Sequence, residues 1–233
     1  MRATPRRLGL LGGTTWHSSI IYEQLLNEGV QAALPGQTAD LVVRSYNFGE
    51  ISAHHAAGTW DELAELYIAD ARWLIDGGAE AILICANTMH KVAPEVQAVI
   101  DVPVISIIDA TAKAILDAGL ENAGLLATGF TMRMPFYRDR MTQQGVTLVI
   151  PEEPDLSEFH HLIYERVANG IIEERDRVGA REAAEKLVSR GAQAIIAGCT
   201  EVPLVLTQDD IDVPLFDSMD LHVKAALEFA LAD

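Results

Sequence analysis

The chain has 233 residues, of which 49% are hydrophobic and 22% charged, enough to bury one large core or two smaller ones. Its 17 Lys and Arg residues against 34 Asp and Glu residues give a net charge of −17, which disfavours binding to nucleic acids and anionic membranes. Glycines interrupt the apolar stretch after the basic start too soon for a signal peptide, and no run reaches the ~18 apolar residues of a membrane helix. We therefore expect a cytoplasmic protein whose two cysteines, Cys85 and Cys199, are free thiols.

Short apolar segments alternate along the chain with stretches of helical period. Strands buried on both faces, as in parallel sheets, are expected at residues 8–11, 41–43, 81–84, 104–107, 124–127, 146–150 and 194–197. Helices are expected to include residues 60–76, 110–118, 159–174 and 180–189. This alternation predicts an α/β fold with doubly wound, mainly parallel sheets flanked by helices.

The two halves of the chain resemble each other. Residues 78–88 match residues 191–201 at an offset of 191 − 78 = 113, and residues 101–104 match residues 212–215 at an offset of 212 − 101 = 111. Two pseudo-symmetric lobes are the simplest explanation, and chance similarity between buried strands is the alternative. Ligands of parallel sheets bind beyond the carboxyl ends of the strands, so we expect the site in a cleft between the lobes, where these ends converge.

Cys199 is the first candidate for catalysis, because it follows a buried strand in the string Gly198-Cys199-Thr200-Glu201. Backbone N–H donors at a strand end can lower the pKa of a thiol from ~8.5, which gives a thiolate able to act as a base or a nucleophile. A small buried cysteine with a structural role is the alternative. The flanking Gly, Thr and Glu favour the catalytic interpretation.

Polar residues that follow other strands are candidates for anion binding. Asn87 and Thr88 can donate hydrogen bonds to a carboxylate, and the N–H groups after them open a helix, although both can also act only as a helix cap. Similar candidates follow other strands: Thr14, Thr15, Asn47, Thr128 and Thr131. The seven His residues lack the spacing of metal ligands, because adjacent pairs such as His54-His55 and His160-His161 point apart.

These motifs resemble the aspartate/glutamate racemase family over nearly the whole chain. The resemblance rests on the strings Gly-Gly-Thr-Thr-Trp at 12–16, Cys-Ala-Asn-Thr-Met-His-Lys at 85–91 and Gly-Cys-Thr-Glu at 198–201, with Thr128 and Thr131. It implies a 1,1-proton transfer without a cofactor or a metal, acting on an acidic amino acid such as aspartate or glutamate through two acid/base groups that flank the α-carbon. It also implies a homodimer of interleaved lobes. The first lobe would consist of residues 1–95 plus a C-terminal strand and helix within 210–233, and the second of residues 96–209.

Within this resemblance, Cys199 is one of the two acid/base groups. The substrate-binding candidates are Thr14, Thr15, Asn47, Asn87, Thr88, Thr128, Thr131, Thr200 and Glu201. Glutamate racemases tend to have His where this chain has Glu201, which points to the aspartate-type or a broader branch.

Ala86 departs from the family pattern. Members have the first acid/base Cys at this position, or a Thr in an L-selective branch, and the internal repeat agrees because 199 − 113 = 86. Neighbouring strand residues point to opposite faces, so a regular strand turns Cys85 away from the site. Three hypotheses follow: a bulge lets Cys85 serve as the acid/base, the chain is a natural or engineered active-site variant, or it is a single-cysteine decarboxylase of the arylmalonate type. A non-catalytic protein that binds small carboxylates is a further alternative.

Overall fold

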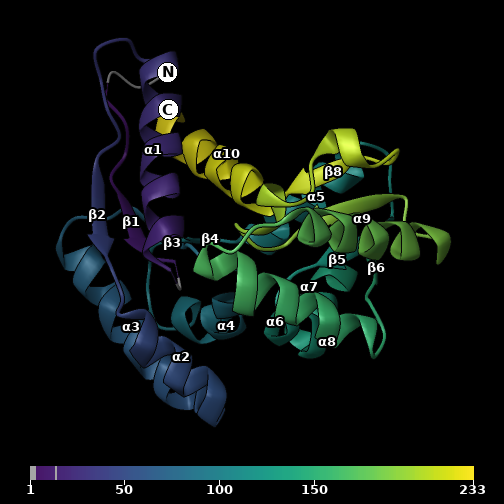
Figure 1. Cartoon of the computed structure of the whole chain (residues 1–233). Coiled ribbons are helices and arrows are strands. Elements are labelled where there is room, and N and C mark those ends of the chain that lie inside the picture. Colours follow the sequence, from purple (N-terminus) through teal and green to yellow (C-terminus); the bar gives the residue numbers. More distant parts are fainter. Residues whose placement is uncertain (1–3, 14) are drawn as a thin grey trace. The chain divides into compact units, whose positions relative to one another are not determined.

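The computed structural model describes residues 4–13 and 15–233 (Figure 1). Its contacts divide the chain into two compact units, here called unit 1 (Met1–Ile107 and His222–Asp233) and unit 2 (Ile108–Leu221). In the described part of the chain, no helix is both long and apolar enough to cross a membrane.

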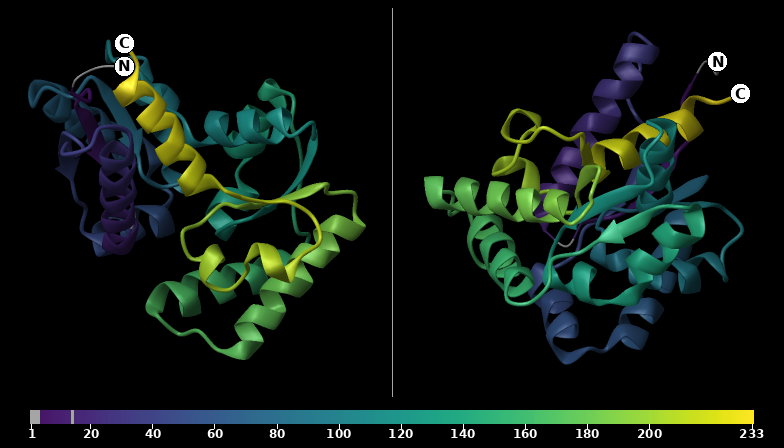
Figure 2. Two further views of the ribbon diagram at one scale, coloured as in Figure 1. Left: turned by 90° about the horizontal axis from the view of Figure 1, so that it is seen from above. Right: turned by 90° about the vertical axis from the view of Figure 1, so that its right-hand side faces the viewer.

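Unit 1 is built on a parallel sheet with the strand order β2-β1-β3-β4. The inner strands β1 and β3 consist of short aliphatic runs that are fully buried, as expected for strands covered on both faces. Helix α3 packs on β1 and β2. Helices α1 and α10 lie side by side in both views of Figure 2, and Gly29 of α1 lets Leu227 of α10 approach closely. The elements are β1 Leu8–Leu11, α1 Trp16–Ala33, β2 Leu41–Arg44, α2 Phe48–Ala57, α3 Trp60–Asp76, β3 Ala81–Ile84, α4 Ala93–Gln97 and β4 Val104–Ile105.

Unit 2 repeats this design with the strand order β6-β5-β7-β8, again all parallel. Every strand of one sheet therefore has a counterpart at the same place in the other sheet, as the internal sequence repeat predicts. The α/β fold with two doubly wound sheets is confirmed. The elements are β5 Asn122–Leu126, α6 Gly129–Arg133, α7 Pro135–Gln144, β6 Thr147–Val149, α8 Asp155–His160, α9 Glu174–Ser189, β7 Ala194–Ala197 and β8 Leu215–Asp217.

The chain passes between the units inside or next to two helices. Helix α5 (Ile107–Asp117) starts at the last residue of this part of unit 1 and continues in unit 2, whereas α10 (Ser218–Leu231) starts in unit 2 and belongs to unit 1 from His222 onward. These boundaries lie twelve residues after the expected ones, since 107 − 95 = 12 and 221 − 209 = 12. The reason is strand pairing: β4 pairs with β3 and β8 pairs with β7, so each strand remains with its own sheet.

Two expected elements differ in the structure. The strand expected at 104–107 covers only residues 104–105, because α5 already begins at Ile107. The single helix expected at 159–174 is interrupted: α8 gives way to a π-helical turn at His161–Arg166 and a 3-10 turn at Val167–Asn169. Gly170 then takes a left-handed conformation (φ 77°), which ends the helical path.

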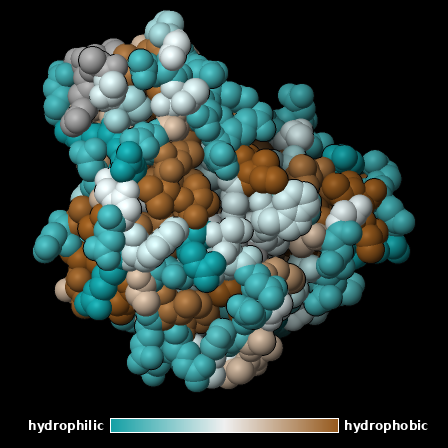
Figure 3. Space-filling model, turned by 90° about the vertical axis from the view of Figure 1, so that its left-hand side faces the viewer, coloured by the Kyte–Doolittle hydropathy of each residue, from teal (hydrophilic) through white to brown (hydrophobic). Residues whose placement is uncertain are grey.

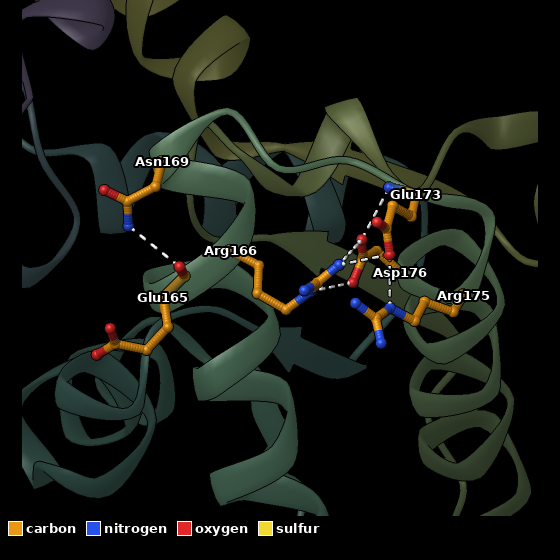
Figure 4. A network of polar contacts seen from close by, with 6 residues as sticks. All are labelled: Glu165, Arg166, Asn169, Glu173, Arg175 and Asp176. Carbon is orange, nitrogen blue, oxygen red and sulfur yellow. Dashed lines mark hydrogen bonds and ion pairs between the residues drawn. The ribbon is translucent and has the colours of Figure 1, made fainter.

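An ion-pair network fixes this break in unit 2 (Figure 4). The Arg166 guanidinium donates to both carboxylate oxygens of the buried Asp176, at 2.7 and 2.9 Å, and to Glu173 at 3.0 Å. Asp176 also accepts the backbone N–H of Glu173 at 2.8 Å and so caps the start of α9. A bidentate ion pair between Arg166 and Asp176 therefore connects the π-helical turn to the next helix, α9.

Several large apolar side chains remain exposed. In unit 1 they include Trp16, Ile20 and Trp73, of which the first two lie one turn apart on α1. Figure 3 shows hydrophobic patches among hydrophilic surface on one face of the molecule. Exposed apolar surface of this kind offers contacts to another protein chain.

Candidate active site

The carboxyl end of β7 brings Cys199 next to the end of β5 within unit 2. The backbone N–H of Gly198 donates to the Leu126 carbonyl at 2.8 Å and extends the pairing of the two strands by one residue. A Cβ atom on Gly198 would stand 3.0 Å from the Cβ of Ala127 and 2.8 Å from Leu125, so glycine permits this close approach. Cys199 therefore leaves the sheet beside the turn that follows β5.

Cys199 is half-buried and forms a compact polar group with its two neighbours. Its thiol donates to Oε2 of Glu201 at 2.7 Å, and the Thr200 hydroxyl donates to the same oxygen at 2.8 Å. Burial first, and the Glu201 carboxylate second, hold the pKa of the Cys199 thiol well above its ordinary value. The direction is opposite to the lowered pKa expected from the strand-end position, because burial disfavours the charged thiolate and the adjacent carboxylate repels it. The resting group is a protonated thiol paired with a proton acceptor.

The turn after β5 carries the second set of predicted residues in unit 2. Thr128 precedes α6, and its hydroxyl lies 3.5 Å from that of the buried Thr131. The backbone N–H of Gly129 donates to Nδ1 of His160 at 3.0 Å, and burial lowers the pKa of this imidazole. His160 also stacks on Tyr164, with ring centroids 5.2 Å apart. The sequence pattern did not indicate this contact, which joins residues 31 positions apart.

Cys85, Ala86, Asn87 and Thr88 leave β3 at the carboxyl edge of the sheet in unit 1. Cys85 is 1% exposed, its N–H continues the strand pairing to Leu11, and burial raises the pKa of its thiol. Its sulfur is thus enclosed in the core, as the alternation of a regular strand predicts, and the regular pairing gives no support to a bulge. Ala86 is half-buried, and Asn87 and Thr88 are less than one tenth exposed at the start of a 3-10 helix (Thr88–Val92).

The turn after β1 lies against the same edge. A Cβ on Gly13 would meet Cβ of Ser18 at 2.5 Å and the Cys85 carbonyl oxygen at 3.0 Å, so this glycine allows the two strand ends to pack together. Thr15 caps α1 and accepts a hydrogen bond from the Ser18 N–H. Thr14, another predicted binding residue, lies outside the described residues. Asn47 is exposed and caps α2 by accepting the Gly49 N–H at 3.1 Å.

The predicted residues thus gather at the strand ends of their own units. Thr128, Thr131, Cys199, Thr200 and Glu201 follow two adjacent strands of unit 2. Thr15, Ala86, Asn87 and Thr88 follow two adjacent strands of unit 1, and Asn47 follows the edge strand β2. Across residues 4–13 and 15–233, no group of three or more His, Cys, Asp or Glu residues is placed to hold a metal ion.

Two cations of unit 1, Arg44 and Lys91, are held by contacts with other side chains. Nε of Arg44 lies 3.2 Å from Oδ2 of Asp70, and its guanidinium covers the Tyr46 ring at 4.9 Å. The Lys91 ammonium lies 5.3 Å from the centroid of the Trp60 ring. Both contacts hold these cations within unit 1 by ordinary ion-pair and cation–π attraction.

Comparisons with known proteins agree over most of the chain. Residues 11–226 match the family model of the Asp/Glu/hydantoin racemases. The structure is similar to that of a candidate Asp/Glu racemase from Yersinia pestis, with a TM-score of 0.92 and 40% identity over 97% of this chain and 99% of the other. An aspartate racemase homologue from Pyrococcus horikoshii OT3 gives a TM-score of 0.84 and 32% identity over the same shares. The broad specificity amino-acid racemase RacX of Bacillus subtilis (strain 168) is 24% identical over 179 residues, 74% of each chain.

Proposed function

The chain belongs to the Asp/Glu/hydantoin racemase family, and from this premise we propose that it moves the α-proton of an acidic amino acid, aspartate or glutamate, without a cofactor. The observation that carries the proposal is the Cys199 thiol, which donates to the Glu201 carboxylate at a strand end lined by hydroxyl groups. A thiol beside a carboxylate is a pair that can both give and accept one proton.

In the proposed mechanism, Cys199 and Glu201 share the work of one acid/base group. When the substrate α-proton is removed, the thiol proton passes to Glu201 and the resulting thiolate takes the α-proton. In the opposite direction, the Cys199 thiol protonates the carbanion, and the thiolate then recovers the proton from Glu201. Thr200 keeps the accepting oxygen of Glu201 in place through its hydroxyl group. We assign the binding of substrate carboxylates to Asn87, Thr88 and the other hydroxyl-bearing residues predicted from the sequence, Thr14 among them.

Ala86 limits what this machinery can do, because its methyl side chain carries no proton. We therefore expect α-proton exchange on the face served by Cys199 to be faster than racemisation, which needs a donor on the opposite face. Ala86 also favours the second candidate function, a single-cysteine decarboxylase of the arylmalonate type. Loss of carbon dioxide already leaves a carbanion, and one proton donor then completes that reaction.

Deuterium exchange at the α-carbon of both enantiomers of aspartate and glutamate tests the proposal. We expect exchange with the wild type, a loss of about 100-fold or more in Cys199→Ala, and retention in the matched variant Cys85→Ala, whose sulfur lies in the core. Ala86→Cys and Ala86→Thr should raise the ratio of racemisation to exchange. The racemase proposal fails if the folded wild type and both Ala86 variants exchange no acidic amino acid. Carbon dioxide release from an arylmalonate would then favour the decarboxylase, and ligand binding alone would favour a non-catalytic binder.

We also propose that the protein is a cytoplasmic homodimer. The proposal follows from the family resemblance, and the exposed Trp16 and Ile20 on α1 offer apolar surface to a second copy. Sedimentation analysis over a range of concentrations, and fractionation of the source cells, test the two statements. A monomer at micromolar concentration, or recovery in a secreted or membrane fraction, contradicts them.

A further inference from the structure

His90 connects the strand-end turn of unit 1 to the start of α5. It lies on the 3-10 helix after β3 and is 3% exposed. Its Nδ1 lies 2.9 Å from the carbonyl oxygen of Ala86, and its Nε2 lies 3.0 Å from the backbone nitrogen of Ile107. One buried imidazole thus contacts backbone atoms of two segments that are far apart in the sequence.

These partners determine where the proton of His90 lies. A backbone N–H can only donate, so Nε2 must be the unprotonated acceptor for Ile107. Nδ1 therefore carries the proton and donates it to the Ala86 carbonyl. Protonating the ring would turn Nε2 into a donor facing the Ile107 N–H, which would break that contact.

The segment that receives His90 is itself held by a second buried imidazole. The Nε2–H of His222 donates to the Ile105 carbonyl at 2.7 Å, and its Nδ1 accepts the Tyr22 hydroxyl at 2.8 Å. The rings of His90 and His222 meet edge to face, with centroids 5.7 Å apart. His222 thus holds residues 105–107 in place, and the Ile107 N–H in turn holds the His90 ring. The ring is therefore fixed in the position in which Nδ1 contacts the Ala86 carbonyl.

We propose that His90 is a positioning residue that sets the orientation of the turn formed by Ala86, Asn87 and Thr88. A peptide group is planar and trans, so holding the Ala86 carbonyl also fixes the direction of the Asn87 N–H on the opposite side. The same contact fixes the direction of any side chain introduced at position 86. The expected effect of His90 on turnover rests on the proposed function. The contacts that position the turn lie within unit 1 and do not depend on that function.

Two amide variants separate the contacts of the ring. In His90→Asn the side-chain NH₂ lies near the place of Nδ1 and can still donate to the Ala86 carbonyl, but the acceptor for Ile107 is lost. In His90→Gln the longer side chain brings its amide oxygen near the place of Nε2, which keeps the Ile107 contact and loses the one to Ala86. If His90 had only a structural role, the activity of both variants would instead fall in proportion to their loss of stability.

For the exchange reaction we expect His90→Gln to lower kcat by about 100-fold and His90→Asn to lower it by less than about 10-fold. We expect smaller changes in KM in both variants. Any gain in racemisation from Ala86→Cys should persist in the double variant with His90→Asn and vanish in the double variant with His90→Gln. Equal losses in the two variants, or a larger loss in His90→Asn, would overturn the inference.

Two measurements on the folded protein do not depend on turnover. Nitrogen NMR of the wild-type imidazole should give a protonated Nδ1 and an unprotonated Nε2, and amide hydrogen exchange at Asn87 and Thr88 should be faster in His90→Gln than in His90→Asn. The opposite tautomer, a charged ring at neutral pH, or unchanged exchange at these amides would refute the inference. If the NMR and amide results hold while no substrate exchanges, the positioning role stands and the proposed racemase function fails.

Discussion

Replacing His222 by Gln should make unit 1 less sensitive to acid. His222 is fully buried, and both ring nitrogens are bound, by the Tyr22 hydroxyl and by the Ile105 carbonyl. Burial, with a smaller contribution from the nearby His90, lowers the pKa of His222 from 6.5 to about 3. The folded protein therefore keeps this ring neutral at pH values where the unfolded chain protonates it.

The size of the effect follows from this difference in pKa. As the pH falls below 6.5, the unfolded state binds a proton at His222 that the folded state binds only near pH 3, so the free energy of unfolding decreases across this window. The full difference is (6.5 − 3) × 1.36, or about 5 kcal/mol, of which about 3 kcal/mol is lost between pH 7.5 and 4.5. Above pH 6.5 the His222 ring is neutral in the folded and in the unfolded state, so the free energy of unfolding keeps its full value there.

Tryptophan fluorescence gives a suitable assay, because all three tryptophans, at positions 16, 60 and 73, belong to unit 1. Urea titrations at several pH values should show that His222→Gln starts less stable at pH 7.5 but loses about 3 kcal/mol less than the wild type on going to pH 4.5. The control His161→Gln, at an exposed position, should follow the wild-type slope. Parallel curves for wild type and His222→Gln would refute the reasoning, since the buried ring would then contribute nothing to acid sensitivity.

Three further predictions concern stability. Burial raises the pKa of Asp217 from 3.8 to about 6, so Asp217→Asn should gain up to about 3 kcal/mol relative to the wild type at pH 8 and nothing below pH 3.8, as measured by urea unfolding. Arg166→Gln leaves its buried carboxylate partner unpaired and should speed amide hydrogen exchange in residues 161–176, whereas unchanged exchange there would contradict a bracing role. Gly13→Ala should cost about 1–3 kcal/mol because of its close contacts, while Gly49→Ala, which has room for a methyl group, should not lower the melting temperature.

Much of the fold follows from local sequence patterns. The apolar runs that became β1, β3, β5 and β7 are fully buried strands, and the duplicated residues 78–88 and 191–201 correctly indicated two sheets of the same design. The local pattern did not indicate the strand β8, because its three half-buried residues end in an aspartate. The family resemblance implied a C-terminal strand in the first lobe, whereas β8 pairs with β7 in unit 2. The prediction of one uninterrupted helix at 159–174 was wrong, because the interruption depends on the contact between Arg166 and Asp176. These two residues meet only after the chain turns at Gly170.

The candidate site was predictable where it depends on neighbours in sequence. Cys199, Thr200 and Glu201 are adjacent, so their mutual contacts require only a sharp turn, and the burial of Cys85 follows from the alternation of a strand. The raised pKa of Cys199 was not predicted, since it depends first on the burial of the sulfur in the folded unit and second on the Glu201 side chain turning back to it. The contacts of His160 with Gly129 and of His90 with Ile107 join separate segments, and no local pattern reports them.

The passage of α10 from unit 2 into unit 1 has a consequence for biosynthesis. Unit 2 is one uninterrupted stretch of chain, whereas unit 1 combines residues synthesised before unit 2 with residues synthesised after it. A nascent polypeptide can thus complete unit 2 before α10 has left the ribosome, whereas unit 1 is complete only when α10 supplies His222 to Tyr22. Removing His222–Asp233 would consequently destabilise unit 1, which contains residues up to Ile107, more than unit 2, which directly precedes the removed segment.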